Sequence, residues 1–452
     1  MYRHPDRHPA LSSRSIVLLL IILVLPLRAV EPQAAQKPRF SSRDEGFLED
    51  LERRSFQYFW DQAGANTGLV LDRTRTDGTP ADEDHRYIAS IAATGFGLTA
   101  ICIASKRGWV KRAAARERVR MTLRFFADRA LQEHGWFYHW MDVNTGERRW
   151  RSEVSSIDTA LLVAGALTAR QCFREDLEIA RLATKIYERI DFSWMLNGHP
   201  TLLSMGWHPE TGFIKARWDD YSEHLILYLL GVGSPTHPIT PEAWYAWRRN
   251  WNEYAGYRYL GKTPLFTYQY SQAWIDFRGR RETRGEHVNY FDNSVKATLA
   301  HRQFCIDLAS EFPSYGTNLW GISASDSMRG YVAWGGPPRD PAIDGTVVPY
   351  AAAGSLMFVP HLAMAALTTM RAKYPLIYAK YGFADAFNPN TGWVNRDVIG
   401  IDLGITLLSA ENARSGNVWR WFMRNREISR ALDLVGLRKK QQRALTSLRK
   451  VA

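Results

Sequence analysis

Three apolar segments rich in small residues, each expected to form a helix, begin close to carboxylate side chains. The carboxylates are Glu153, Asp158, Glu223 and Asp402. Helices that direct their N-termini to the same end of a scaffold would bring such groups together above a rigid core. Hydrolysis of a glycosidic bond needs one protonated carboxylic acid and one carboxylate that activates water or attacks. The pattern therefore predicts an acid/base site for cleaving a sugar polymer.

The sequence supports a catalytic role more strongly for some of these carboxylates than for others. Asp158 precedes a long apolar run and could equally be the N-cap of its helix, because Asp is a favoured cap residue. Glu223 lies in an apolar stretch, where an unpaired carboxylate is costly to bury, and this favours a functional role. We expect Glu223 to be the general acid and Glu153 its partner or the base, with Asp158 and Asp402 as further catalytic candidates.

Loops that carry glycine together with many aromatic, histidine and arginine residues lie near these carboxylates in the sequence. Flat aromatic rings suit the C–H faces of sugars, and charged or amide groups suit the hydroxyls. Packing between helices is the alternative role for large aromatic side chains. The candidate substrate-binding residues in these loops are Trp136, Tyr138, His139, Trp207, His208, Arg217, Trp218, Tyr221 and Trp393.

Helical periodicity dominates the chain, and the helical segments alternate in character. Six carry charges on one face and should face water, at about 44–62, 110–131, 174–190, 241–256, 287–310 and 415–435. Six are apolar nearly all round and should be buried, at about 89–104, 155–170, 221–231, 266–277, 349–370 and 402–413. Two concentric layers of alternating helices predict an all-α fold, an (α/α)6 toroid built as a double-layer barrel of six helical hairpins.

A turn motif of a polar residue, Thr, Gly and an apolar residue occurs at 66–69, 210–213 and 390–393. Glycine supplies the positive φ that such turns need. Turn chemistry is therefore sufficient to explain the motif, and its spacing does not indicate a solenoid repeat.

The 452 residues are 46% hydrophobic and 13% aromatic, and no Pro/Ser-rich linker interrupts residues 45–435. We expect one large domain over 45–435. Residues 1–35 combine a basic stretch, a short apolar run and small residues, which predicts a signal peptide or, if uncleaved, an N-terminal membrane anchor. Both interpretations predict a periplasmic or secreted protein. Residues 436–452 form a basic C-terminal tail, interpreted as a solvated helix end.

Other classes of function receive little support from the composition and motifs. The net charge is +12, but the basic residues are scattered, so we expect no nucleic-acid partner. Cys102, Cys172 and Cys305 lack metal-ligand spacing and are expected to pack in the core, with one disulfide as the alternative. The histidines are dispersed and no phosphate-binding glycine motif occurs in the sequence, so neither a metal nor a cofactor is expected.

Several ordered motifs extend over residues 45–435. They lie at 58–60, 66–73, 90–98, 152–160, 220–223, 231–235, 315–316, 320–326, 400–402 and 411–412. In these motifs the chain resembles the glycoamylase-like family of bacterial (α/α)6 proteins, grouped with glycoside hydrolase family 144, whose known activity is endo-β-1,2-glucanase. One departure is Leu403-Gly404-Ile405, where the family more often has a polar residue and a proline.

The resemblance implies a hydrolase acting on β-glucan, most of all β-1,2-glucan, with Glu153 and Glu223 in the catalytic cleft and Asp326 and Asp402 near the substrate. We expect an inverting reaction, because carboxylates on different helices leave room for a water molecule. The expected form is a monomer whose partner is a polysaccharide or oligosaccharide, with membrane contact only through an uncleaved N-terminal segment. The alternatives are a polysaccharide lyase on the same fold and a non-catalytic glucan-binding envelope protein.

Overall fold

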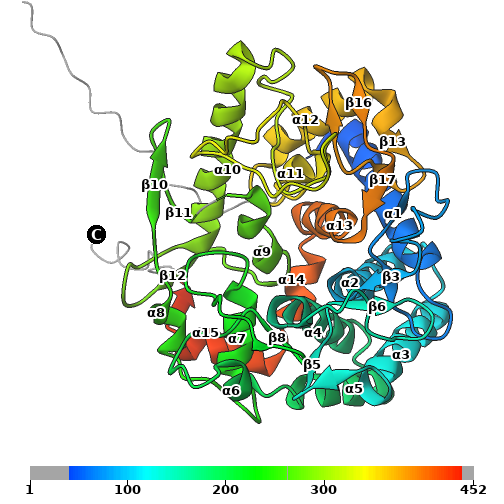
Figure 1. The fold of residues 1–452 in the computed structure, drawn as a ribbon, viewed down its shortest axis with the longest axis vertical. Coiled ribbons are helices and arrows are strands. Elements are labelled where there is room, and N and C mark those ends of the chain that lie inside the picture. The colour runs from blue at the N-terminus through cyan, green and yellow to red at the C-terminus, as the bar shows by residue number, and fades with distance from the viewer. Residues whose placement is uncertain (1–39, 262, 440–452) are drawn as a thin grey trace, which may run out of the picture. The chain divides into compact units, whose positions relative to one another are not determined.

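The computed structural model describes residues 40–261 and 263–439, which belong to one compact unit dominated by helices. The long helices with an exposed face are α1 (Ser42–Asp61), α3 (Arg112–Asp128), α5 (Leu177–Glu188), α10 (Tyr290–Asp307) and α12 (Pro360–Lys373). The helices buried on most sides are α2 (Ile91–Arg107), α4 (Ser156–Cys172), α7 (Leu225–Gly233), α9 (Tyr270–Trp274), α11 (Pro349–Ala353) and α13 (Gly400–Arg414). Within this unit the buried helices lie towards the centre of the view and the exposed ones lie outside them (Figure 1).

The remaining regular structure is short and lies in the connections. The other helices are α6 (Phe192–Met195), α8 (Ala243–Ala246), α14 (Asn417–Phe422), α15 (Arg426–Leu434), η1 (Leu265–Tyr268), η2 (Leu308–Ser310) and η3 (Pro375–Ile377). The strands are β1 (Val70–Leu71), β2 (Arg73–Arg75), β3 (Ile88–Ser90), β4 (Gln132–Glu133), β5 (Trp136–Phe137), β6 (Trp140–Asp142), β7 (Val154–Ser155), β8 (Gly206–His208), β9 (Gly212–Phe213), β10 (Trp251–Tyr254), β11 (Tyr257–Leu260), β12 (Arg280–Glu282), β13 (Tyr378–Ala379), β14 (Gly382–Phe383), β15 (Phe387–Asn388), β16 (Trp393–Val394), β17 (Asp397–Ile399) and β18 (Leu437–Lys439). The predicted turn motifs are confirmed, since Gly68, Gly212 and Gly392 all have positive φ.

Three buried helices begin directly after a short strand. Strand β3 leads into α2, β7 into α4 and β17 into α13. These strands pair antiparallel with segments distant in sequence, β3 with β1 and β6, β7 with β8, and β17 with β2. The last residues of β3 and β7, Ser90 and Ser155, cap their helices by accepting the amides of Ala93 and Asp158.

Backbone hydrogen bonds connect the starts of these three helices to one another. The amide of Gly400 donates to the carbonyl of Asp72 at 2.7 Å, and Asp72 in turn donates to β3. The amide of Ile91 donates to His139 at 3.3 Å, and the amide of His139 donates to Glu153 at 3.0 Å. The N-terminal ends of α13, α2 and α4 are thereby fixed side by side.

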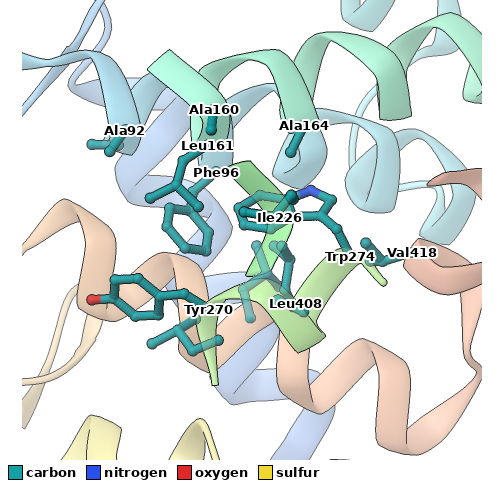
Figure 2. Close-up of a cluster of buried hydrophobic side chains, with 14 of the residues drawn as sticks. Ala92, Phe96, Ala160, Leu161, Ala164, Ile226, Tyr270, Trp274, Leu408 and Val418 are labelled. Atoms are coloured by element: carbon teal, nitrogen blue, oxygen red, sulfur yellow. The ribbon is translucent and has the colours of Figure 1, made fainter. Parts of the chain in front are cut away.

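Below these N-termini the buried helices meet in a shared apolar core. Figure 2 shows part of it, with side chains from α2, α4, α7, α9, α13 and α14 in one cluster. Phe96 of α2 lies at its centre, with its ring centroid 4.7 Å from that of Trp274 and 5.6 Å from that of Tyr270. The indole nitrogen of Trp274 donates to Thr99 at 3.0 Å, so the large polar-edged ring is buried with its donor satisfied.

Glycine allows α2 and α4 to approach to backbone contact. A Cβ atom on Gly165 would lie 2.1 Å from the carbonyl oxygen of Gly95, and one on Gly95 would lie 2.3 Å from the carbonyl oxygen of Leu161. Neither backbone can move away without separating two central helices. The small residues that marked these segments in the sequence therefore act by removing side-chain volume at the contact.

The prediction of one exposed helix over 241–256 is wrong. That stretch contains the single turn α8 followed by the hairpin β10–β11, in which Tyr254 pairs with Tyr257 across a turn of Ala255 and Gly256, both with positive φ. A two-residue turn of this kind and cross-strand aromatic pairs stabilise a hairpin over a helix. Helix α15, predicted as part of a longer segment, packs against α7.

Other expected helices are interrupted. The segment 349–370 divides into α11 and α12, and Pro360 starts the second helix at its first position. The segment 415–435 divides into α14 and α15 at Asn425, whose side-chain amide donates to the carbonyls of Phe422 and Leu167. The segment 266–277 contains only η1 and the short α9.

The two ends of the chain and the cysteines were also the subject of predictions from the sequence. The predicted N-terminal segment 1–35 and residues 440–452 of the basic tail lie outside the described residues. At the start of that tail Leu437–Lys439 form β18, which pairs with β12, in place of the expected helix end. Cys102 and Cys305 are buried and Cys172 is half-buried, all three as free thiols. In the part of the chain that the structure describes, no helix combines the length and apolarity needed to span a bilayer.

Two Gly→Ala substitutions, one inside the contact between α2 and α4 and one outside it, should change the stability of the protein in opposite directions. Gly165→Ala should destabilise the protein by roughly 1–3 kcal/mol or more, because its Cβ must displace backbone. Gly46→Ala in α1, where a Cβ meets nothing within 4 Å, should stabilise it by about 0.5–1 kcal/mol. Urea unfolding of both variants measures the difference. Equal midpoints would contradict the close contact.

Candidate active site

The first turn of α4 orients Asp158. Ser155, three residues earlier, is the N-cap, and its hydroxyl donates to Asp158 Oδ2 at 2.6 Å while accepting the Asp158 amide at 3.3 Å. Asp158 is therefore not the N-cap, a role that the sequence allowed. It lies three residues after the N-cap Ser155 and bonds to it through both its carboxylate and its amide. Its other oxygen faces His139 at 3.5 Å.

His139 joins two of the candidate carboxylates. Its Nδ1 lies 2.9 Å from Glu153 Oε1, and its Nε2 lies 3.5 Å from Asp158 Oδ1. The imidazole stacks on Trp140, with ring centroids 3.9 Å apart and planes 16° apart. Both nitrogens of a ring held in this way act as donors when the ring is protonated. His139 is thus placed as an imidazolium between two carboxylates.

The charges in this group reinforce one another. Burial alone would lower the pKa of His139, but the negative charges of Asp158 and Glu153 outweigh it and raise the pKa above its ordinary value. Burial alone would raise the pKa of Glu153, but the hydrogen bond and the charge of His139 hold that pKa below its ordinary value, with His208 acting in the same direction. Glu153 is therefore kept as a carboxylate.

Glu223 experiences the opposite environment. It lies two residues before α7, and its backbone carbonyl accepts the hydroxyl of Ser271 from α9 at 2.5 Å. The hydroxyl of Ser222 donates to its carboxylate. Burial raises the pKa of Glu223, and the negative charge of Asp158 raises it further, against the opposing effect of the Ser222 hydrogen bond. Among these carboxyl groups Glu223 is thus the one poised to carry a proton.

A second acidic group forms around the start of α13. Asp385 accepts the amide of Asp326 at 2.9 Å and the side-chain amide of Asn395 at 3.0 Å. Asn395 also donates to Asp326 Oδ2 at 3.0 Å, and the guanidinium of Arg73 donates to the same oxygen at 2.9 Å. Asp402, in the first turn of α13, is hydrogen-bonded to Asp385. The structure therefore brings the predicted residues Asp326 and Asp402 together.

Asp385 and Asp402 share a proton. Burial and the charge of Asp385 raise the pKa of Asp402 well above its ordinary value, and burial together with the charge of Asp326 raises the pKa of Asp385 to about 7. The buried Oδ1 of Asp385 receives no nitrogen or hydroxyl donor among the described residues. A proton on Asp402 satisfies that oxygen, because two adjacent buried carboxylates cannot both ionise at low cost.

Tyr270 connects the two acidic groups. Burial raises its pKa, and the charges of Asp402, Glu223 and Asp158 each raise it further, so the phenol lies within electrostatic reach of all three. Figure 2 shows Tyr270 at the edge of the apolar cluster, with its oxygen directed away from Trp274. The four predicted carboxylates therefore lie at the same end of the helical core.

Three predicted substrate-binding residues are buried between helices. Trp136 has no exposed surface, and its indole nitrogen donates to the carbonyl of Asp191. Trp218 is buried and donates to the hydroxyl of Ser156, and Tyr221 is buried in an aromatic cluster. These rings fill the space between helices, which was the alternative role for large aromatic side chains.

The other predicted binding residues are distributed around the site. Trp207 and His208 lie on β8, where Trp207 pairs with Val154 beside Glu153. Tyr138 is half-buried beneath the guanidinium of Arg148. Two residues are placed by structural roles: Arg217 donates to two loop carbonyls at 2.8 and 2.6 Å, and Trp393 pairs with Asn388 in the β15–β16 hairpin.

Asp385, Asn395 and Arg73 form the part of the site that sequence reasoning missed. Asp385 is a lone carboxylate within Phe383-Ala384-Asp385-Ala386-Phe387. The same criterion that singled out Glu223, a carboxylate in an apolar stretch, could have found it. Arg73 ends one of the motifs that carry the family resemblance, but its partners come from β17 and from the loop before α11, which no local pattern predicts.

His139, Glu153 and Asp158 are also the described residues that could ligate a metal ion, with one candidate ligand atom from each lying within 4.8 Å of the others. The imidazole directs a different nitrogen to each carboxylate. One ion cannot take the place of both contacts, whereas a protonated ring satisfies both. Hydrogen bonding therefore accounts for the geometry of this group.

Comparison with known proteins gives this arrangement a context. A family model named Glycoamylase, with the description "Putative glucoamylase", matches residues 215–426. The exo beta-1,2-glucooligosaccharide sophorohydrolase (non-reducing end) of Parabacteroides distasonis is 25% identical over 445 residues, which cover 90% of this chain and 60% of that relative. This chain thus spans less than two thirds of the length of that enzyme. The resemblance to the glycoamylase-like family is confirmed.

Solved structures extend the similarity to the fold. The endo-beta-1,2-glucanase from Chitinophaga pinensis, in complex with sophorotriose and glucose, is 27% identical with a TM-score of 0.81 over 88% of this chain and 99% of that one. The endo-beta-1,2-glucanase from Talaromyces funiculosus, in complex with sophorose, is 13% identical with a TM-score of 0.61 over 86% of this chain and 87% of that one. The second similarity concerns the fold alone. Both place this chain among helical-barrel proteins.

The imidazolium between Glu153 and Asp158 predicts a pH dependence of stability. Because the pKa of His139 is raised on folding, its contribution is full below its unfolded pKa and is lost as pH rises through the folded pKa. The wild type should therefore lose more stability than His139→Asn between pH 6 and pH 9. Urea unfolding at both pH values measures this. Equal losses would contradict the charged bridge.

The proton shared by Asp385 and Asp402 predicts a second pH dependence of stability, at lower pH than that of His139. The pKa of Asp385 is raised to about 7 on folding, so its contribution is lost as pH rises from its unfolded pKa through 7. The stability of the wild type should fall over this range with an added slope of up to about 1.4 kcal/mol per pH unit, which Asp385→Asn should remove. The exposed Asp84→Asn serves as the control and should keep the slope. An unchanged slope in Asp385→Asn would contradict a buried titrating carboxyl.

Proposed function

We propose that this protein is a glycoside hydrolase that cleaves β-1,2-glucan by acid/base catalysis. The observation that carries the proposal is a set of carboxyl groups at one end of the helical core. Among them the pKa of Glu223 is raised and the pKa of Glu153 is lowered from the ordinary value. Pairs of acids whose environments separate their pKa values are the usual way to assign a general acid and a base. The similarity to the Chitinophaga pinensis enzyme over 99% of its chain supports β-1,2-glucan as the substrate.

The proposed architecture is the (α/α)6 toroid. Helices α1 and α2, α3 and α4, α5 and α7, and α12 and α13 alternate between exposed and buried along the chain, as such a toroid requires. Helix α15 packs against α7. The expected helix over 241–256 is replaced in part by the hairpin β10–β11. In this arrangement every inner helix directs its N-terminus to the substrate.

In the proposed mechanism Glu223 donates its proton to the oxygen of the leaving sugar. Glu153, held as a carboxylate by His139, accepts a proton from the water that attacks the anomeric carbon from the opposite face. Attack from the opposite face inverts the configuration, and it requires about 6.5–9.5 Å between the two carboxyl groups. Asp158 keeps His139 protonated and oriented. The Asp385–Asp402 pair and Asp326 provide acceptors for sugar hydroxyls.

We further propose that the enzyme acts as a monomer in the periplasm or outside the cell. The basis for the location is the apolar run with basic and small-residue flanks in residues 1–35, which lies outside the described residues.

The test is incubation of the purified protein with linear β-1,2-glucan, with β-1,3-glucan and a uronate polymer as comparisons. Chromatography should show short β-1,2-linked oligosaccharides, and Glu223→Gln should lower the rate about 10²–10⁴-fold, because the general acid is removed. The exposed Glu83→Gln is the matched control and should retain full activity. NMR of fresh product should show the inverted anomer first.

The alternatives give different results in the same experiment. An unsaturated product with ultraviolet absorbance would overturn hydrolysis in favour of a lyase. Binding of the glucan without any product would overturn catalysis in favour of a glucan-binding protein. The fall of kcat at low pH reports protonation of the base. If Asp402→Asn, and not Glu153→Gln, removes that fall, the base is in the Asp385–Asp402 pair and the assignment to Glu153 is wrong.

A further inference from the structure

A row of aromatic rings leads away from the carboxylates. It begins at His139, whose ring stacks on Trp140 with a centroid distance of 3.9 Å. Trp140 meets Trp150 edge to face at 5.5 Å, and Trp150 meets His85 edge to face at 5.1 Å. We call Trp140, Trp150 and His85 the aromatic row. Its inner end contacts the residue that binds both Glu153 and Asp158.

Exposure along the row is greatest at Trp150, its middle member. Trp140 and His85 are half-buried, whereas Trp150 is 47% exposed, one of few large apolar side chains so open among the described residues. Apolar surface of this size left in water is unfavourable, and an exposed patch continuous with a functional site commonly marks a binding surface. Core packing, which explains Trp136, does not explain Trp150.

The chain holds Trp150 in an uncommon conformation. Trp150 and Arg151 have φ values of 51° and 49°, a region that bulky residues rarely adopt. The guanidinium of Arg148 braces this loop by donating to the carbonyls of Ser152 and Arg151, each at 2.6 Å, and it pairs with Glu210 at 2.7 Å. Backbone strain of this kind persists where surrounding bonds enforce it, often at ligand-binding positions. The backbone that follows Trp150 is therefore held in place before any ligand arrives.

We propose that the aromatic row is an outer subsite that binds sugar units of the glucan chain remote from the bond being cleaved, and that it sets a preference for long substrates. The inference rests on the proposed function for the identity of the chain. The exposed ring of Trp150 packs against the C–H face of a glucose unit, as aromatic surfaces in ligand sites do. Arg151, 80% exposed beside it, donates to the hydroxyls of the same unit.

The test compares long and short substrates in Trp150→Ala. On β-1,2-glucan polymer its KM should rise about tenfold with kcat unchanged, the loss expected for one aromatic contact. On the shortest oligosaccharide that the wild type cleaves, KM and kcat should both stay the same, because that substrate does not reach the row. Trp150→Phe should restore most of the affinity for the polymer. Leu376→Ala, which removes an exposed apolar side chain from η3, is the control and should match the wild type.

Each other outcome has a defined meaning. Equal KM for the polymer in wild type and Trp150→Ala overturns the subsite while leaving hydrolysis intact. An equal fall of kcat on long and short substrates also overturns it, because Trp150 would then act only by supporting Trp140 and His139. If the wild type cleaves no β-1,2-glucan, the proposed function fails. The subsite is then judged by affinity electrophoresis in gels containing the glucan, where retardation that Trp150→Ala abolishes supports it and unchanged mobility overturns it.

Discussion

The site depends on one structural constraint, the fixed meeting of helix N-termini above the contact between α2 and α4. Gly95 and Gly165 let those helices touch backbone to backbone. The hydrogen bonds from Gly400 to Asp72 and from His139 to Glu153 then tie the segments that precede α13 and α4 into the same layer. Since Glu153, Asp158 and Asp402 lie on or next to these segments, the backbone fixes where each of these side chains begins.

On this frame the electrostatics divide the acids into those that keep their charge and those that do not. Glu153 remains charged because the hydrogen bond and the charge of His139 hold its pKa below the ordinary value. Glu223 is half-buried and its carboxylate accepts the hydroxyl of Ser222, and the desolvation of the charged form raises its pKa and favours the protonated acid. A site with a stable carboxylate and a stable carboxylic acid at the same pH does not have to redistribute protons when an uncharged sugar replaces water.

The sequence was informative where one physical effect dominates. Periodicity found α1, α2, α3, α4, α5, α7, α10 and α13 because burial of an apolar face or of a whole helix is a local pattern. It failed at 241–256, where the hairpin is decided by a two-residue turn and by aromatic pairs across it, both compatible with a helical spacing of apolar residues. The sequence pattern placed Glu153, Asp158 and Asp402 at helix starts. Their partners His139 and Asp385 come from other segments, and no spacing rule in the sequence predicts such contacts. Trp136 shows the same limit: its composition and loop context match those of a sugar-binding residue, and only burial separates the two roles.

The adjacency of His139 and Trp140 links the proposed catalytic carboxylate to the proposed outer subsite. One residue carries the imidazole that holds Glu153 ionised, and the next begins the aromatic row, with the two rings stacked. The segment that contains them is pinned on both sides, by the pairing of β6 with β3 and by the bond from the His139 amide to Glu153. In the proposed subsite, a sugar chain lying along the row is therefore positioned relative to Glu153, the proposed base, through a rigid segment and not through a flexible loop. Positioning of this kind converts binding far from the reacting bond into correct placement at it, which is where remote contacts contribute to catalysis.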